Sequence, residues 1–168
     1  MDIIQLREYC LSFKGATEDF PFDEDTLVFK VMGKMFALVG LEKWEMGNPA
    51  INLKCDPEKA IELREKYPEE IYAGYHMSKK HWNTVVINGS QLTEKQIKHF
   101  INHSYELVVS KLTKKQKQEV KKRILQLLPK HIGWGSNKII STILRDEFTF
   151  LSDVDENKLQ NKILGQAP

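Results

Sequence analysis

The sequence predicts an α+β fold in which an antiparallel sheet of about five strands is flanked by helices. Two observations lead to this prediction. Helix-type and strand-type apolar patterns follow one another in the order helix, three strands, helix, two strands, helix. Most of the strands are consecutive and joined by short turns, which is the arrangement of antiparallel sheets.

The first half of this region contains one helix and three strands. Asp2, with Gln5 three residues later, forms a capping-box pattern that predicts a helix over residues 2–13. Met32-Gly33 separates two runs rich in β-branched and aromatic residues, as in a two-residue hairpin. The strands are expected at residues 26–31, 34–39 and 50–54, with a polar loop at 42–49.

The second half repeats the pattern of caps and strands. Asp56-Pro57 is typical of an N-cap followed by proline at the first helical position, and Pro68 ends this helix. Thr93 and Gln96 form a second capping box, which opens a long amphipathic helix over about 93–112. The two strands between these helices are expected at residues 71–77 and 82–87.

The charge distribution is uneven along the chain. Residues 1–110 carry 13 Lys/Arg and 17 Asp/Glu, whereas residues 111–130 carry eight basic residues and one acidic residue. The basic stretch also has an apolar stripe that predicts a helix to Pro129, continuing or following the long one. Further helices are expected at 136–148 and after Asp153 or Asp155.

The composition excludes several classes of protein. The 41% hydrophobic content is enough for a packed core, and no apolar run has membrane-spanning length. Residues 1–5 lack the basic and apolar regions of a signal peptide. The two cysteines form no disulfide framework. We therefore expect a reduced, cytoplasmic protein that does not span a membrane.

The segment at residues 74–85 is the most informative part of the chain. It reads GYHMSKKHWNTV and places two aromatic residues, two histidines and two lysines beside a strand-like run. A buried strand has little use for this mixture, because buried lysine and histidine need partners. An exposed surface that binds an anionic or aromatic ligand would use all of it.

Five segments in a defined order resemble one known family. They are GATEDFPF at 15–22, FKVMGKMFAL at 29–38, NLKCDP at 52–57, the 74–85 segment and SYELV at 104–108. On these segments, residues 1–112 closely resemble the MmcQ/YjbR family. The family pattern ends near Leu112, so the resemblance implies a 1–112 α+β domain followed by a 113–168 helical extension. The resemblance implies a sheet flanked by helices, shaped like the secretion-chaperone fold. It also implies hairpins comparable to the two wings of a double-wing DNA-binding module.

The candidate nucleic-acid-binding residues lie on the hairpins and the basic stretch. Lysines would contact phosphates, and Tyr75, His76, His81 or Asn83 would stack on or hydrogen-bond to bases and sugars. The alternative is an ordinary hairpin whose turn lysines are solvated, and a basic helix that keeps its charged face in water. Trp82 is expected to be largely buried, because it heads a strand in which it alternates with Thr84 and Val86. The basic candidates are Lys30, Lys34, Lys54, Lys79, Lys80, Lys114, Lys115, Lys117, Lys121, Lys122 and Arg123.

Catalytic and metal-binding patterns are absent from the sequence. His99 and His103 share a helix face but have no third ligand nearby, so we expect no metal and no cofactor. Cys55 precedes a helix N-terminus, which makes it the better candidate for a reactive thiol, and Cys10 is expected in the core. The acidic run at 18–25 is expected to be a solvated loop anchored to the core by Phe20 and Phe22.

These patterns favour a DNA-binding protein that is not an enzyme. Two alternatives stay open. One is a protein-interaction adaptor with a secretion-chaperone-like fold. The other is a small-ligand-binding protein with Tyr75, His76 and Trp82 in a cleft.

Overall fold

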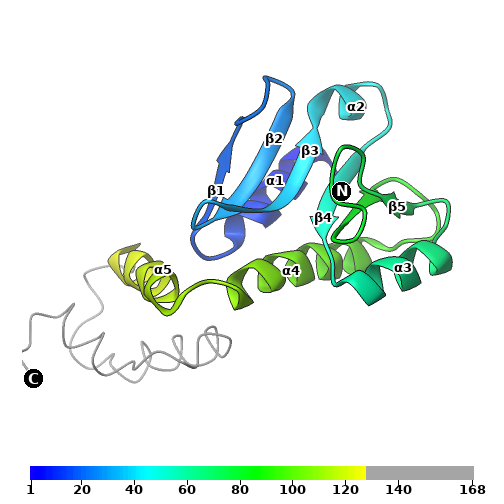
Figure 1. Cartoon of the computed structure of the whole chain (residues 1–168). Helices are drawn as coiled ribbons and strands as arrows, with labels where there is room; N and C mark the ends of the chain where they lie inside the picture. Colours follow the sequence, from blue (N-terminus) through cyan, green and yellow to red (C-terminus); the bar gives the residue numbers. More distant parts are fainter. Residues whose placement is uncertain (128–168) are drawn as a thin grey trace, which may run out of the picture. The chain divides into compact units, whose positions relative to one another are not determined.

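The computed structural model describes residues 1–127, with side chains described through residue 122. The chain divides into two units, Met1–Lys111 and a second that begins at Leu112. Figure 1 shows the described elements in colour. The helices expected at 136–148 and after Asp153 or Asp155 lie outside the described residues.

The first unit is an α+β domain built on a six-stranded antiparallel sheet, so the predicted fold class is confirmed. The strand order is β1-β2-β3-β4-β6-β5. The helices are α1 (Ile3–Ser12), α2 (Leu41–Glu45), α3 (Pro57–Lys66) and α4 (Glu94–Ser110), followed in the second unit by α5 (Lys114–Leu127). The strands are β1 (Ala16–Asp19), β2 (Thr26–Val31), β3 (Lys34–Gly40), β4 (Ala50–Lys54), β5 (Ile71–Ala73) and β6 (Trp82–Val86).

Three elements differ from the prediction. Strand β1 includes the first two residues of the expected loop at 18–25, where Glu18 pairs with Arg7 of α1 and Asp19 pairs with Lys30 of β2. The polar loop at 42–49 begins with the short helix α2, whose first amides bond to Asp25. Strand β5 ends at Ala73, so the expected strand 71–77 is mostly a loop.

The helix starts are held by the predicted side chains. Both capping boxes are present, with Asp2 accepting from the Gln5 amide and Thr93 from the Gln96 amide. Asp56 caps α3 and accepts from the Glu58 amide. Such caps each stabilise a helix by about 1 kcal/mol.

The turn between β2 and β3 has left-handed backbone at both central residues. The φ angles are 50° at Met32 and 75° at Gly33. This combination matches the twist of an antiparallel hairpin, and glycine adopts it without steric cost.

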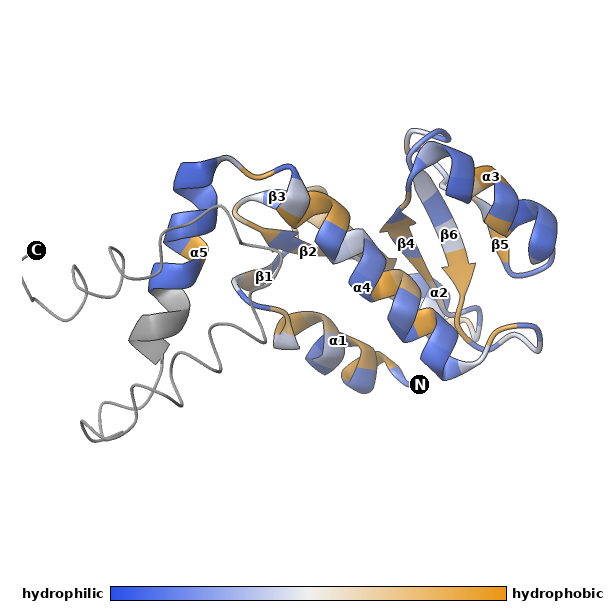
Figure 2. Ribbon diagram, turned by 90° about the horizontal axis from the view of Figure 1, so that it is seen from below, coloured by the Kyte–Doolittle hydropathy of each residue, from blue (hydrophilic) through white to orange (hydrophobic). Residues whose placement is uncertain are grey.

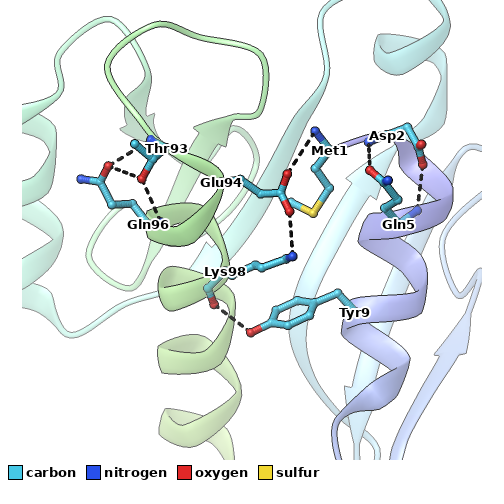
Figure 3. A network of polar contacts seen from close by, with 8 residues as sticks. All are labelled: Met1, Asp2, Gln5, Tyr9, Thr93, Glu94, Gln96 and Lys98. Atoms are coloured by element: carbon cyan, nitrogen blue, oxygen red, sulfur yellow. Dashed lines mark hydrogen bonds and ion pairs between the residues drawn. The ribbon is translucent and has the colours of Figure 1, made fainter.

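Polar contacts join the starts of α1 and α4. Figure 3 shows Glu94 between the Met1 ammonium group, at 3.8 Å, and Lys98, at 2.7 Å. The Tyr9 hydroxyl of α1 donates to the Lys98 carbonyl at 3.4 Å. These contacts link α1 to α4.

Helices α1, α3 and α4 lie on the same face of the sheet (Figure 2). The core under α1 and α4 is aromatic: Phe13 stacks on Tyr105 with ring centroids 4.6 Å apart, and Phe36 of β3 meets both rings edge-on. Burial raises the pKa of the Tyr105 hydroxyl, which donates to the Lys14 carbonyl.

The second face of the sheet carries a smaller apolar cluster. Val28 and Leu38 are cross-strand partners in β2 and β3, and Trp82 of β6 packs with them. Val28 points away from the face that Phe29 shares with the helices, because successive side chains alternate across a strand. Trp82 is only 5% exposed, so its predicted place in the core is confirmed. The half-buried Met35 and Met77 pack against this cluster.

Candidate nucleic-acid interface

The sheet topology brings two hairpin connections to one end. Strand β4 runs antiparallel to β3 and therefore ends, at Lys54, near the Met32–Gly33 turn. Lys54 pairs with Trp82, the first residue of β6. The β5–β6 loop, residues 74–81, leads into Trp82 and so emerges at the same end. We term this region the hairpin end of the sheet.

Ser104 of α4 joins β3 and β4 at the hairpin end. Strands β3 and β4 pair directly at two positions, Ala37 with Leu53 and Leu38 with Asn52. Next to them, the Lys54 amide donates to Ser104 Oγ at 2.8 Å, and the Ser104 hydroxyl donates to the Phe36 carbonyl. The hydroxyl thus replaces a direct backbone bond and satisfies both strands. The strands separate here, between Lys54 and the start of β3.

The two lysines of the first hairpin are engaged within the domain. Lys30 forms an ion pair with Asp19 at 2.9 Å, and this contact lowers the pKa of the Asp19 carboxyl. Lys34 Nζ donates to the Lys111 carbonyl at the end of α4, at 3.4 Å. Both ammonium groups therefore serve local structure.

Lys54 lies between the two hairpins in an unusual setting. Its Nζ is 5.3 Å from the centroid of the Trp82 ring, a cation–π arrangement. Burial lowers the pKa of Lys54, and the positive charges of Lys111 and Lys34 lower it further. No ion pair within residues 1–122 involves Lys54, so an incoming anion would relieve the repulsion.

The 74–81 loop is anchored by its backbone. The Gly74 amide donates to the Trp82 carbonyl at 3.0 Å, and the Trp82 amide donates to the Ser78 carbonyl at 3.0 Å. The His81 carbonyl accepts from the Cys55 amide at 2.9 Å. The side chain of Met77 packs on the Val28–Leu38–Trp82 cluster. Tyr75, His76, Lys79, Lys80 and His81 are left exposed.

Arg64 of α3 binds the backbone of the loop, a role that no pattern in the sequence predicts. Its guanidinium donates to the carbonyls of Lys79 and Trp82 and, at 2.7 Å, to the side chain of Asn83. No periodicity marks this arginine. The contact between Arg64 and the 74–85 segment exists only because the fold places α3 against β6.

Three candidate ligands are removed by their burial. Asn83 is 2% exposed, and its buried amide is satisfied by accepting from Arg64 and donating to the Ala60 carbonyl at 3.3 Å. Lys117 and Lys121 are also buried. The other basic candidates of α5, namely Lys114, Lys115 and Lys122, are exposed, and the side chain of Arg123 lies outside the described residues.

The thiols do not support nucleophilic chemistry. Burial raises the pKa of Cys55 despite its position before α3, and burial raises the pKa of Cys10 to about 12. Among residues 1–122, no group of three or more His, Cys, Asp or Glu side chains could hold a metal ion. His103 is half-buried, and its pKa is lowered by that burial and by Lys59.

The acidic segment at 18–25 differs from its prediction. Phe20 and Phe22 are 46% and 62% exposed and do not anchor the loop to the core. The loop is held instead by Asp23, which accepts from the amides of Asp25 and Thr26. These aromatic residues lie at the opposite end of the sheet from the 74–81 loop, because β1 and β2 are joined there.

A protein-family comparison identifies the domain. The model of the YjbR family matches residues 11–107, more than half of the chain. The chain belongs to the YjbR family. The match covers all six strands, α2, α3 and most of α4, and therefore includes the hairpin end of the sheet.

Several relatives of the YjbR type are known. Escherichia coli YjbR is 33% identical over 127 residues, which cover 76% of this chain and 100% of that protein. Escherichia coli O157:H7 YbdF is 40% identical over 102 residues, covering 61% of this chain and 80% of that protein. Both are described as uncharacterised proteins.

Solved structures show the same fold. The Deinococcus radiodurans protein DR2400, a DUF419 domain, superposes with a TM-score of 0.64 at 36% identity and covers 81% of this chain and 95% of its own. A Pseudomonas syringae protein superposes with a TM-score of 0.54 at 32% identity, covering 64% of this chain and 98% of its own. None of the helices described within residues 1–127 is long and apolar enough to cross a membrane.

Proposed function

We propose that this chain is a DNA-binding protein that acts by binding rather than by catalysis, and that it works in the cytoplasm. The main support for this proposal is the way in which the 74–81 loop is held. Its anchors are backbone groups, Arg64 and Met77, and the exposed side chains of Lys79 and Lys80 are not among them, which leaves them free to contact phosphates. The resemblance of the hairpins to a double-wing module supports the same role.

Charge limits how strong this binding can be. Residues 1–110 have four more acidic than basic residues, so the domain as a whole repels DNA. Attraction must come from the hairpin end, which carries the exposed Lys79 and Lys80 in its loop and the half-buried Lys54 at the end of β4. The exposed lysines of α5 would add contacts from the second unit. Such binding is weak and falls steeply with salt, because each phosphate contact releases counterions.

A salt titration with paired variants tests this proposal. Lys79→Ala with Lys80→Ala should lower the slope of log affinity against log salt by about 1.8, since each lost contact contributes roughly 0.9. Thermal stability should stay within about 0.5 kcal/mol of the wild type, because both side chains are exposed. Fluorescence anisotropy with duplex DNA gives the affinities.

The matched control is Lys30→Ala with Lys34→Ala. It removes the same charge from the neighbouring hairpin, but from lysines that are engaged by Asp19 and the Lys111 carbonyl. We expect a much smaller change in the slope. Equal slopes for the two double variants would show that only net charge matters and would remove the loop from the interface.

A protein-interaction role is the second candidate, and the exposure of Phe20 and Phe22 favours it. Pro21 and both phenylalanines, with Asp23 and Glu24, line an open depression of ≈ 470 Å³. Fixed, exposed aromatic side chains are typical anchors of protein interfaces. Sedimentation velocity at rising concentration tests homotypic contact: association that Phe20→Ser with Phe22→Ser abolishes would support this role, and a monomer at all concentrations would contradict self-assembly.

A further inference from the structure

We propose that Tyr75 and His76 form a stacking platform for an unpaired base, so that the 74–81 loop binds single-stranded DNA in preference to duplex. This inference rests on the proposed DNA-binding function and specifies its ligand. Its main support is that one loop presents two exposed rings together with Lys79 and Lys80.

The two rings project from the domain and contact each other. Tyr75 is 72% exposed, the highest exposure among the large hydrophobic side chains described. The centroids of the Tyr75 and His76 rings are 3.9 Å apart, with an interplanar angle of 56°. Neither ring contributes to the apolar clusters of the sheet. Their apolar surface is therefore available to a ligand.

The backbone at His76 is held in an unfavourable conformation. Its φ angle is 54°, in the left-handed region that costs most residues free energy. The following amide, of Met77, donates to the Gly74 carbonyl at 3.3 Å and closes the turn. A glycine at position 76 would remove this cost, but it would also remove the ring that the turn presents beside Tyr75.

Tight packing on both sides fixes the platform. A Cβ atom at Gly74 would lie 3.1 Å from the Cβ atoms of both Met77 and Trp82, so the chain before Tyr75 lies close against the sheet. Met77, after His76, is held on the Val28–Leu38–Trp82 cluster. The rings are thus presented by an ordered backbone, which reduces the entropy lost on binding.

The ligand follows from what such rings can contact. In duplex DNA the faces of the bases are covered by their neighbours, so an aromatic side chain can stack only on an unpaired base. Stacking on an aromatic ring accepts any base, because every base has a π face. Lys79 and Lys80, three to five residues along the same loop, are placed to meet the phosphates of the same strand.

The test compares an unstructured oligo(dT) strand with a duplex of the same length by fluorescence anisotropy at fixed salt. Tyr75→Leu removes the ring but keeps an apolar side chain. We expect it to weaken single-strand binding by about 5- to 150-fold, the range for loss of one stacked base, and to leave duplex binding unchanged. Tyr75→Phe should bind the single strand as the wild type does.

Phe22→Leu is the matched control, because Phe22 is a similarly exposed aromatic residue, 62% exposed, at the opposite end of the sheet. It should change neither affinity. Thermal melting checks that every variant folds, and the exposure of Tyr75 makes unfolding by its replacement unexpected.

The outcomes separate this inference from the proposed function. If Lys79→Ala with Lys80→Ala weakens binding but Tyr75→Leu does not, stacking is overturned and DNA binding stands. If wild-type protein binds duplex as tightly as the single strand, the preference is overturned. If neither DNA is bound at low salt, both the inference and the proposed function fail.

Discussion

The two hairpins at one end of the sheet are held in opposite ways. The β2–β3 hairpin closes with two residues, and its lysines are used to bind Asp19 and the end of α4. The β5–β6 hairpin has an eight-residue loop at 74–81 that is held by backbone hydrogen bonds, Arg64 and the half-buried Met77. The first hairpin uses its side chains for its own structure, and the second leaves them for a ligand.

This difference shows that the number of lysines does not define a binding surface. Each hairpin carries two lysines, and the sequence makes all four candidates for phosphate contact, with Lys30 and Lys34 assisting Lys79 and Lys80. What distinguishes them is the partner of each ammonium group. Within residues 1–122, no ion pair involves Lys79 or Lys80, whereas Lys30 has a carboxylate at 2.9 Å. Unengaged charge on a fixed backbone is the better sign of a site.

Among the substitutions that test this contrast, replacement of Trp82 should lower the stability of the domain most. Its ring supports Met77 of the loop and lies under Lys54, so the second hairpin depends on it. We expect Trp82→Ala to lower the free energy of unfolding by about 3–5 kcal/mol in a urea titration. Trp82→Phe, which keeps an aromatic ring, should cost less. A loss below about 1 kcal/mol would mean that the loop does not rely on this apolar support.

The link between the hairpins can be tested at Ser104. Ser104→Ala leaves the Lys54 amide and the Phe36 carbonyl without their shared partner, so we expect a loss of about 1–3 kcal/mol. Ser110→Ala in the same helix is the control, because that hydroxyl is exposed and bonds to the Leu107 carbonyl. If both variants unfold at the same urea concentration, direct pairing of β3 with β4 must be sufficient.

Replacement of Lys54 should have a smaller effect on stability, and the change should be a gain. Lys54→Met removes a half-buried charge that Lys111 and Lys34 repel, so the variant should melt at a higher temperature while binding DNA less well. The pKa of Lys54 is lowered in the folded state, so its charged form destabilises the fold at neutral pH. This penalty should disappear as the pH rises toward the ordinary lysine value, near 10.5, and the melting temperatures should converge. Lys80→Met, at an exposed site, should show no such pH-dependent gain.

Much of the fold could be predicted because its determinants are local. Both capping boxes involve residues three apart, and the Met32–Gly33 turn needs only its own backbone freedom. Trp82 was placed in the core by alternation along its own strand. Strand β1 was missed because acidic residues are typical of loops, and its partners Arg7 and Lys30 are each 11 residues away.

The candidate site was only partly predictable for the same reason. The 74–85 segment was identified by its composition, but composition could not separate Asn83, which faces α3, from His81, which faces solvent. Arg64 fixes the loop from another element and carries no local signal. The exposure of Phe20 and Phe22 was also missed, because aromatic residues in a loop ordinarily anchor it.

The outer strands of the sheet determine how this domain can meet other molecules. Strand β1 has four residues and strand β5 has three, and each forms one edge. An edge this short offers few backbone groups to an approaching chain, and Glu18 and Asp19 add charge to β1. The sheet is therefore poorly suited to grow by adding a strand from a partner. Recognition must proceed through side chains and loops, and the domain is protected from edge-to-edge aggregation.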